Sequence, residues 1–112
     1  MKIYGIPNCG SVKKALDFVK ASGVEYEFID FKKQKPALAQ VEAWAKAVTM
    51  DRLFNTKGTK YKSSGLEYKT MSEADKLSAL AAEPTMIKRP VIEHKGKVIV
   101  GFDEEAYKKE LI

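Results

Sequence analysis

The sequence predicts a mixed α/β fold within one domain spanning residues 1–112. Three observations support this fold class. An apolar segment, a helical pattern and a second apolar segment occupy residues 1–31, which is typical of a βαβ unit. Helical patterns fill most of residues 36–84. Two short alternating segments and a final helical one, typical of a ββα unit, lie within residues 85–112, so residues 1–31 and 85–112 are expected to form the core.

The N-terminal unit begins with a predicted strand from Lys2 to Ile6, which ends at the turn pair Pro7-Asn8. A helix is predicted from near Ser11 to Gly23, a residue type favoured just after a helix end. Its apolar residues recur at the spacing of one helix face: Val12, Ala15, Leu16 and Val19. The segment from Tyr26 to Phe31 alternates and predicts a second strand, parallel to the first and reached by a right-handed crossover.

The middle third begins with a helix opened by Pro36, and Trp44 lies at the edge of its apolar face. The residues predicted on that face are Leu38, Val41, Ala45 and Val48. We interpret Trp44 as a residue that fills the core rather than a ligand platform. The pattern breaks around residues 49–51, and residues 51–54 predict a further helical turn.

A polar loop able to present N–H groups follows at residues 55–59, and no element is predicted between Tyr61 and Tyr68. Ser72 and Asp75 resemble a capping box at the start of the next helix. That helix ends at Pro84, and its expected apolar face consists of Ala74, Leu77 and Ala81.

The C-terminal unit contains Pro90, which excludes an uninterrupted central strand at that position. Either Pro90 begins an edge strand, or the preceding peptide bond is cis and forms a turn beside an important site. Segments Val91–Glu93 and Lys97–Val100 flank a short turn and predict a hairpin. Asp103 is suited to cap a last helix over Glu104–Leu111.

Composition limits the classes of function. Hydrophobic residues make up 45% of the chain and charged residues 31%, as in globular proteins, and the net charge of +5 favours anionic small molecules or acidic protein surfaces. The lysines are scattered, so nucleic-acid binding is not expected. We find no apolar segment of membrane-spanning length and no leader pattern, and we expect a cytoplasmic location. His94, the single histidine, has no ligand companions, so no metal site is expected.

Cys9, the single cysteine, lies between the first predicted strand and the first predicted helix. Backbone N–H groups and the positive end of a helix dipole lower the pKa of a thiol and bind anions at such a position. A free cysteine also occurs as a small buried apolar residue, and that interpretation stays open. Ser11 is either the N-cap of the helix or an additional donor to the thiolate. A lone thiol forms no internal disulfide and suits a reducing compartment.

Three segments in order carry a resemblance to a known family. They are Ile6-Pro7-Asn8-Cys9 at a strand end, Asn55-Thr56-Lys57-Gly58 after a helical segment, and Arg89-Pro90 before a terminal hairpin and helix. In this combination the chain resembles the arsenate reductase (ArsC)/Spx family, and most closely its small YffB-like branch. The resemblance covers nearly the whole chain. It implies a thioredoxin-like fold with a helical insertion, in which the bond before Pro90 is cis and Pro90 faces Cys9.

The resemblance also implies a restricted chemistry. Family arsenate reductases surround the thiolate with three arginines, and only Arg89 matches them here. The other two positions correspond to Asn55 and Gly101. Lys57 matches a basic loop residue of the YffB-like branch, but an ammonium is a point donor and not a planar fork. We therefore expect arsenate to be a poor substrate.

Spx-type regulators carry a C-x-x-C switch and bind the α subunit of RNA polymerase, whereas Val12 occupies the second position of that motif here. Oxidised Cys9 must then be rescued by an external thiol such as glutathione. The resemblance therefore implies a glutathione-dependent monothiol reductase that binds no cofactor, is monomeric, and has glutaredoxin as a further partner. An Spx-like regulator that binds RNA polymerase and a catalytically inactive family member remain the alternatives.

The expected site comprises a catalytic pair and a surrounding anion-binding set. Cys9 is the expected nucleophile, and Arg89 is expected to hold an anionic substrate or a glutathione carboxylate. The residues expected to bind the anion or glutathione around this pair are Gly10, Ser11, Val12, Asn55, Lys57 and Pro90.

Overall fold

The computed structural model describes residues 1–111 and contains a four-stranded sheet with the strand order β2-β1-β3-β4. The strands are β1 (Lys2–Gly5), β2 (Glu27–Asp30), β3 (Val91–His94) and β4 (Lys97–Val100). β1 pairs in parallel with β2 and antiparallel with β3, and β3 pairs antiparallel with β4. The predicted parallel N-terminal pair and C-terminal hairpin are therefore confirmed.

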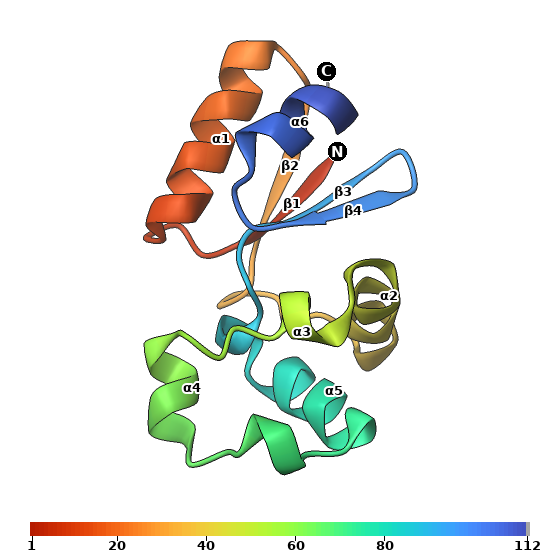
Figure 1. Ribbon diagram of the computed structural model, residues 1–112. Coiled ribbons are helices and arrows are strands. Elements are labelled where there is room, and N and C mark those ends of the chain that lie inside the picture. Colours follow the sequence, from red (N-terminus) through yellow and green to blue (C-terminus); the bar gives the residue numbers. More distant parts are fainter. Residues whose placement is uncertain (112) are drawn as a thin grey trace.

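Helices lie on both sides of this sheet (Figure 1). α1 (Gly10–Ser22) connects β1 to β2, and α6 (Glu104–Glu110) follows β4. Between β2 and β3 come four helices: α2 (Leu38–Val48), α3 (Met50–Leu53), α4 (Thr59–Ser64) and α5 (Glu73–Ala82). Two 3₁₀ turns, Tyr68–Thr70 and Pro84–Met86, complete this helical segment. The βαβ and ββα units around it make the fold thioredoxin-like. Within residues 1–111, no helix has both the length and the apolar character needed to cross a membrane.

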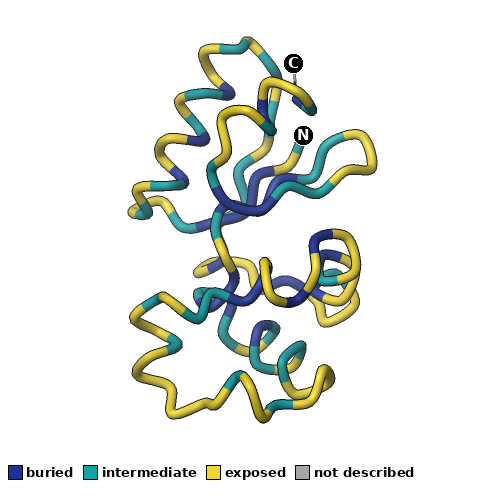
Figure 2. Tube along the Cα trace, in the orientation of Figure 1, coloured by how far each residue is buried: buried dark blue, intermediate teal, exposed yellow. Residues whose placement is uncertain are grey.

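Two apolar clusters lie on opposite faces of the sheet, because successive side chains of a strand alternate between its faces. The cluster against α1 and α6 contains Ile3, Ala15, Val19, Ile92, Tyr107 and Leu111. The larger cluster toward α2, α3 and α5 includes Tyr4, Val41, Trp44, Leu53, Leu80 and Val91. Figure 2 shows that buried positions run through the sheet and into the inner sides of these helices. The sheet is thus packed on both faces, and the loop from β1 to α1 follows an interior strand of the sheet.

The first turn of α1 packs closely on the end of β1. A Cβ atom at Gly5 would lie 2.7 Å from Val12 Cγ2, which is closer than packed side chains tolerate. Gly5 therefore allows α1 to begin directly beside β1, and this contact fixes the position of Cys9, which lies between the two elements.

A polar network attaches α2 to the sheet. Trp44 Nε1 donates a hydrogen bond to Glu93 Oε2 and the Tyr4 hydroxyl donates to Glu93 Oε1, both at 2.7 Å. Gln40 Nε2 donates to the Tyr4 hydroxyl at 2.9 Å. Burial, with the adjacent Glu93 carboxylate, raises the pKa of Tyr4 to about 12. Trp44 is fully buried, so its predicted role in the core is confirmed, although its polar role was not predicted.

Several expectations for the helical segment are wrong. Leu38 begins α2 and is 51% exposed, so α2 buries Val41, Trp44 and Val48 without it. Ala74 is also exposed, because α5 contacts the core mainly through Leu80. Helix α4 begins at Thr59, inside the predicted polar loop, and extends through part of the segment for which no element was predicted.

The backbone at Pro90 decides between the two alternatives for that residue. β3 begins directly after Pro90 and is a central strand, lying between β1 and β4, so the edge-strand alternative is wrong. The Arg89–Pro90 peptide bond is cis. The Pro90 carbonyl accepts a hydrogen bond of 2.8 Å from the Gly101 N–H, which joins the segment before β3 to the end of β4.

Candidate functional site

Cys9 lies at the N-cap position of α1, with an extended backbone (φ −96°, ψ 128°). Its carbonyl accepts a hydrogen bond of 3.0 Å from Lys13 N–H, and its own N–H donates to the Ile6 carbonyl at 3.4 Å. Because Cys9 itself occupies the N-cap, the interpretation of Ser11 as the N-cap is wrong, and Ser11 is the second residue of the helix. The Cys9 side chain is partly exposed, so it is accessible to a small reactant.

The surroundings of the thiol favour its ionised form. Burial raises the pKa of Cys9, but hydrogen bonding from the Val12 amide, the Arg89 guanidinium and the Ser11 amide opposes this effect, as does the positive charge of Arg89. The opposing interactions outweigh burial, and the pKa of the Cys9 thiol lies below its usual value. An N-terminal helix turn and one arginine thus favour the thiolate form of this cysteine.

Arg89 comes from the segment between the Pro84–Met86 turn and β3, and its position is fixed by the backbone. Its Nη1 donates a hydrogen bond to the Thr85 carbonyl. Its Nε is buried and has no hydrogen-bond partner within the described chain. None of the ion pairs formed within residues 1–111 includes Arg89. No carboxylate of the described residues therefore neutralises the guanidinium charge beside the thiol.

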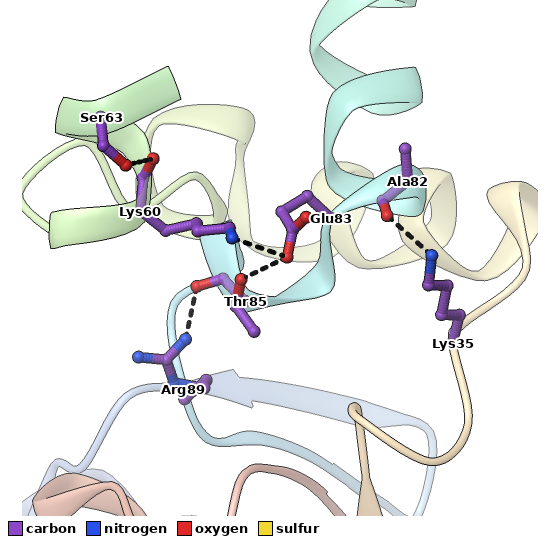
Figure 3. Close-up of polar contacts among 7 residues, drawn as sticks. All are labelled: Lys35, Lys60, Ser63, Ala82, Glu83, Thr85 and Arg89. Carbon is purple, nitrogen blue, oxygen red and sulfur yellow. Dashed lines mark hydrogen bonds and ion pairs between the residues drawn. The ribbon is translucent and has the colours of Figure 1, made fainter. Parts of the chain in front are cut away.

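Arg89 lines a cleft of about 510 Å³. Figure 3 shows Arg89 with Lys60, Glu83 and Thr85, which also line this cleft. Ile6 and Tyr61 supply apolar parts of its wall, and Ile6 also carries the carbonyl that accepts the Cys9 N–H. The charged groups that line it are Lys32, Lys60, Glu83 and Arg89. The cleft thus combines three cations with one carboxylate, and one of the cations, Arg89, also lowers the pKa of the Cys9 thiol.

The structure brings four of the predicted site residues together: Cys9, Ser11, Val12 and Arg89. Gly10 begins α1 and is exposed. Pro90 is buried directly after Arg89.

Residues of the 55–58 loop line two different hollows. Asn55 lines the cleft with Arg89, and its Oδ1 accepts a hydrogen bond of 3.3 Å from the Lys57 N–H. Lys57 is exposed and lines a second hollow of about 270 Å³, which it shares with Asn55 and Lys88. Gly101 has a φ of 82°, and a Cβ atom there would lie 3.5 Å from Lys88 Cε. The two positions at which the family arginines are missing therefore face different neighbours.

Sequence reasoning missed the carboxylate and hydroxyl of the cleft. Thr85 donates its hydroxyl hydrogen bond to Glu83 Oε1 at 2.8 Å, and Lys60 Nζ lies 3.8 Å from the same oxygen. Neither Glu83 nor Thr85 belongs to a periodic pattern or a motif. Their nearness to Arg89 in the sequence was the available signal. In the described part of the chain, no three His, Cys, Asp or Glu side chains come together as a metal-ligand set.

The chain is similar to known proteins over nearly its whole length. Residues 4–110 match the model of the ArsC family. YusI of Bacillus subtilis is 33% identical over 97% of this chain and 96% of its own length. An arsenate reductase of Rhizobium meliloti is 29% identical over 80% of this chain and 66% of its own length. The solved structure of the YFFB protein superposes with a TM-score of 0.91 at 31% identity, covering 99% of this chain and 98% of that protein. The chain therefore belongs to the ArsC family, and its similarity to YFFB supports the YffB-like branch that the sequence indicates.

Proposed function

We propose that this protein is a glutathione-dependent monothiol reductase in which Cys9 is the nucleophile and Arg89 holds the anionic part of the substrate. The observation that carries the proposal is the environment of the thiol. Two helix amides and an arginine with no carboxylate partner in residues 1–111 lower its pKa. The sequence contains no second cysteine that could resolve an oxidised Cys9.

The reaction proceeds by two thiol–disulfide exchanges. The Cys9 thiolate attacks the glutathione sulfur of a mixed disulfide, the S–S bond breaks, and the other thiol leaves as a thiolate that takes up a proton. A new disulfide now joins Cys9 to glutathione. A second glutathione, as thiolate, attacks the glutathione sulfur of that disulfide, which releases glutathione disulfide and regenerates the Cys9 thiolate. In the net reaction, one glutathione thiol is oxidised for each mixed disulfide that is reduced, and the products are the free substrate thiol and one glutathione disulfide.

Arg89 contributes in both exchanges. Its charge favours the attacking thiolate in the first and the leaving thiolate in the second, because both place negative charge on Cys9 Sγ. Its planar guanidinium also suits a carboxylate of glutathione. A cytoplasmic location agrees with this proposal, because the reducing glutathione pool is found there.

Activity toward a glutathionylated peptide tests the proposal directly. We expect release of the peptide thiol to be coupled to formation of glutathione disulfide, and to be lost in Cys9→Ser. A hydroxyl has nearly the shape of a thiol and is far less nucleophilic, so the variant should keep its fold. Absence of turnover by a folded wild-type protein whose Cys9 labels rapidly would contradict the reductase proposal. It would favour a binding function, such as docking on RNA polymerase.

A further inference from the structure

Glu83 places a carboxylate inside the cleft that leads to Arg89. The side chain is held by the Thr85 hydroxyl and by Lys60, as Figure 3 shows. Both contacts use Oε1, and no described residue donates a hydrogen bond to Oε2. Since the Glu83 side chain is 42% exposed, this second oxygen is an acceptor available to a ligand.

Glu83 and Arg89 both form hydrogen bonds with Thr85 but form no ion pair with each other. Arg89 binds the Thr85 carbonyl, and Glu83 accepts from the Thr85 hydroxyl. No ion pair joins the carboxylate to the guanidinium. The cleft therefore presents a carboxylate that can bind a cation and a guanidinium that can bind an anion. Thr85 holds both groups.

This arrangement distinguishes two kinds of anion. An inorganic oxyanion carries only negative charge, so Glu83 weakens the attraction that Arg89, Lys32 and Lys60 exert on it in this cleft. A ligand that carries both an ammonium and a carboxylate satisfies Glu83 and Arg89 together, through charge-assisted hydrogen bonds. We propose that Glu83 is a specificity-determining residue that binds the free amino group of a zwitterionic thiol substrate and disfavours inorganic oxyanions at Arg89. This inference rests on the proposed function, because it names the substrate class of the same site.

The test measures binding with a ligand that cannot react. S-methylglutathione has the amino group and both carboxylates but no free thiol, and N-acetyl-S-methylglutathione lacks the ammonium. Each is titrated as a protector of Cys9 against iodoacetamide, at constant ionic strength, in the wild-type protein and in Glu83→Gln. We expect the wild type to bind the acetylated ligand about fivefold more weakly than the free amine, and Glu83→Gln to bind the two within twofold of each other.

Glu42→Gln is the matched control. Glu42 forms a similar exposed ion pair, with Lys46 at 3.6 Å, but lies on α2 and does not line this cleft. Glu42→Gln and Glu83→Gln each remove one negative charge, so any general effect of net charge on ligand binding appears in both variants. We expect Glu42→Gln to keep the wild-type preference for the free amine. Inorganic phosphate, used as the protector in a parallel titration, should bind about threefold more tightly to Glu83→Gln and should not change with Glu42→Gln.

A preference for the free amine that persists in Glu83→Gln would overturn the inference, as would equal binding of both ligands by the wild type. Thr85→Val gives a second variant, since it removes the hydroxyl that holds Glu83 Oε1 and keeps the carbonyl that holds Arg89. It should weaken the preference with little effect on the pKa of Cys9. Because the ligands are unreactive, a failure of turnover contradicts the reductase proposal alone, whereas a failure of discrimination contradicts the role of Glu83 alone.

Discussion

Arg89 acts on the thiol of Cys9 although 80 positions separate the two residues in the sequence. The contact depends on the sheet. β1 and β3 are adjacent antiparallel strands, so the residue that follows the loop after β1 lies near the residue that precedes β3. The Thr85 carbonyl then holds the guanidinium in place. Strand pairing thus brings the Cys9 thiol and the Arg89 guanidinium together, and the Thr85 carbonyl holds the guanidinium there.

Arg89→Ala should raise the pKa of Cys9, because it removes both a hydrogen bond to the thiolate and a nearby positive charge. The pH midpoint of alkylation by iodoacetamide should move upward, and alkylation at neutral pH should slow by about threefold to tenfold. Arg52→Ala removes the chain's other arginine, which is exposed and lines the second hollow, and should leave the midpoint unchanged. An unchanged midpoint in Arg89→Ala would show that Arg89 does not act on the thiol.

Oxidation with glutathione disulfide should stop at a single adduct. Cys9 is the only cysteine, so exchange forms one mixed disulfide per chain and no second thiol resolves it. Intact-mass measurement should show one glutathione added to the wild type and none added to Cys9→Ser. Reduced glutathione should then remove the adduct. A protein that stays unmodified while an ordinary exposed thiol reacts would indicate that Cys9 is inert.

Arsenate should be a poor substrate even when glutathione and glutaredoxin are supplied. Arg89 is the single arginine among the described residues that line the cleft, and the carboxylate of Glu83 lines the same cleft. Asn55→Arg adds a second guanidinium to that cleft and should increase protection of Cys9 by arsenate about threefold to tenfold. Gly101→Arg is a weaker test, because its φ of 82° strains any side chain and its Cβ would meet Lys88. Rapid arsenate reduction by the wild type, lost in Cys9→Ser, would contradict the argument from missing arginines.

The sequence allowed the strands, α1 and the terminal hairpin to be predicted because each depends on local periodicity, whereas the pairing of β1 with β3 was not predicted from it. Cys9 could be placed at a helix start for the same reason. The cleft could not be predicted, because Lys32, Tyr61, Glu83 and Arg89 come from separate elements and meet only through tertiary packing. Leu38 shows a related limit. Its spacing fits the apolar face of α2, but it is the first residue of the helix and extends beyond the surface that α2 buries.

Sequence periodicity could not predict the hydrogen bonds of Glu93 either, because they join a carboxylate of β3 to the side chains of Tyr4 in β1 and Trp44 in α2. The contribution of the Tyr4 hydroxyl to the free energy of unfolding should decrease at alkaline pH. The folded protein raises the pKa of Tyr4 from 10.0 to about 12, so the protonated hydroxyl is favoured by folding. This contribution is therefore fully present below pH 10 and is lost as the pH rises from about 10 to about 12.

Tyr4→Phe should remove that pH dependence. At pH 8, loss of the hydroxyl should lower the free energy of unfolding by about 1 kcal/mol, because Gln40 and Glu93 each lose a hydrogen-bond partner. As the pH rises from 10 to 12, the difference between wild type and variant should shrink, since the wild type alone loses the contribution of the Tyr4 proton. Urea unfolding of both proteins at pH 8 and pH 11 measures this difference directly. A difference that stays constant over that range would show that the pKa of Tyr4 is not raised by its contacts in the folded protein.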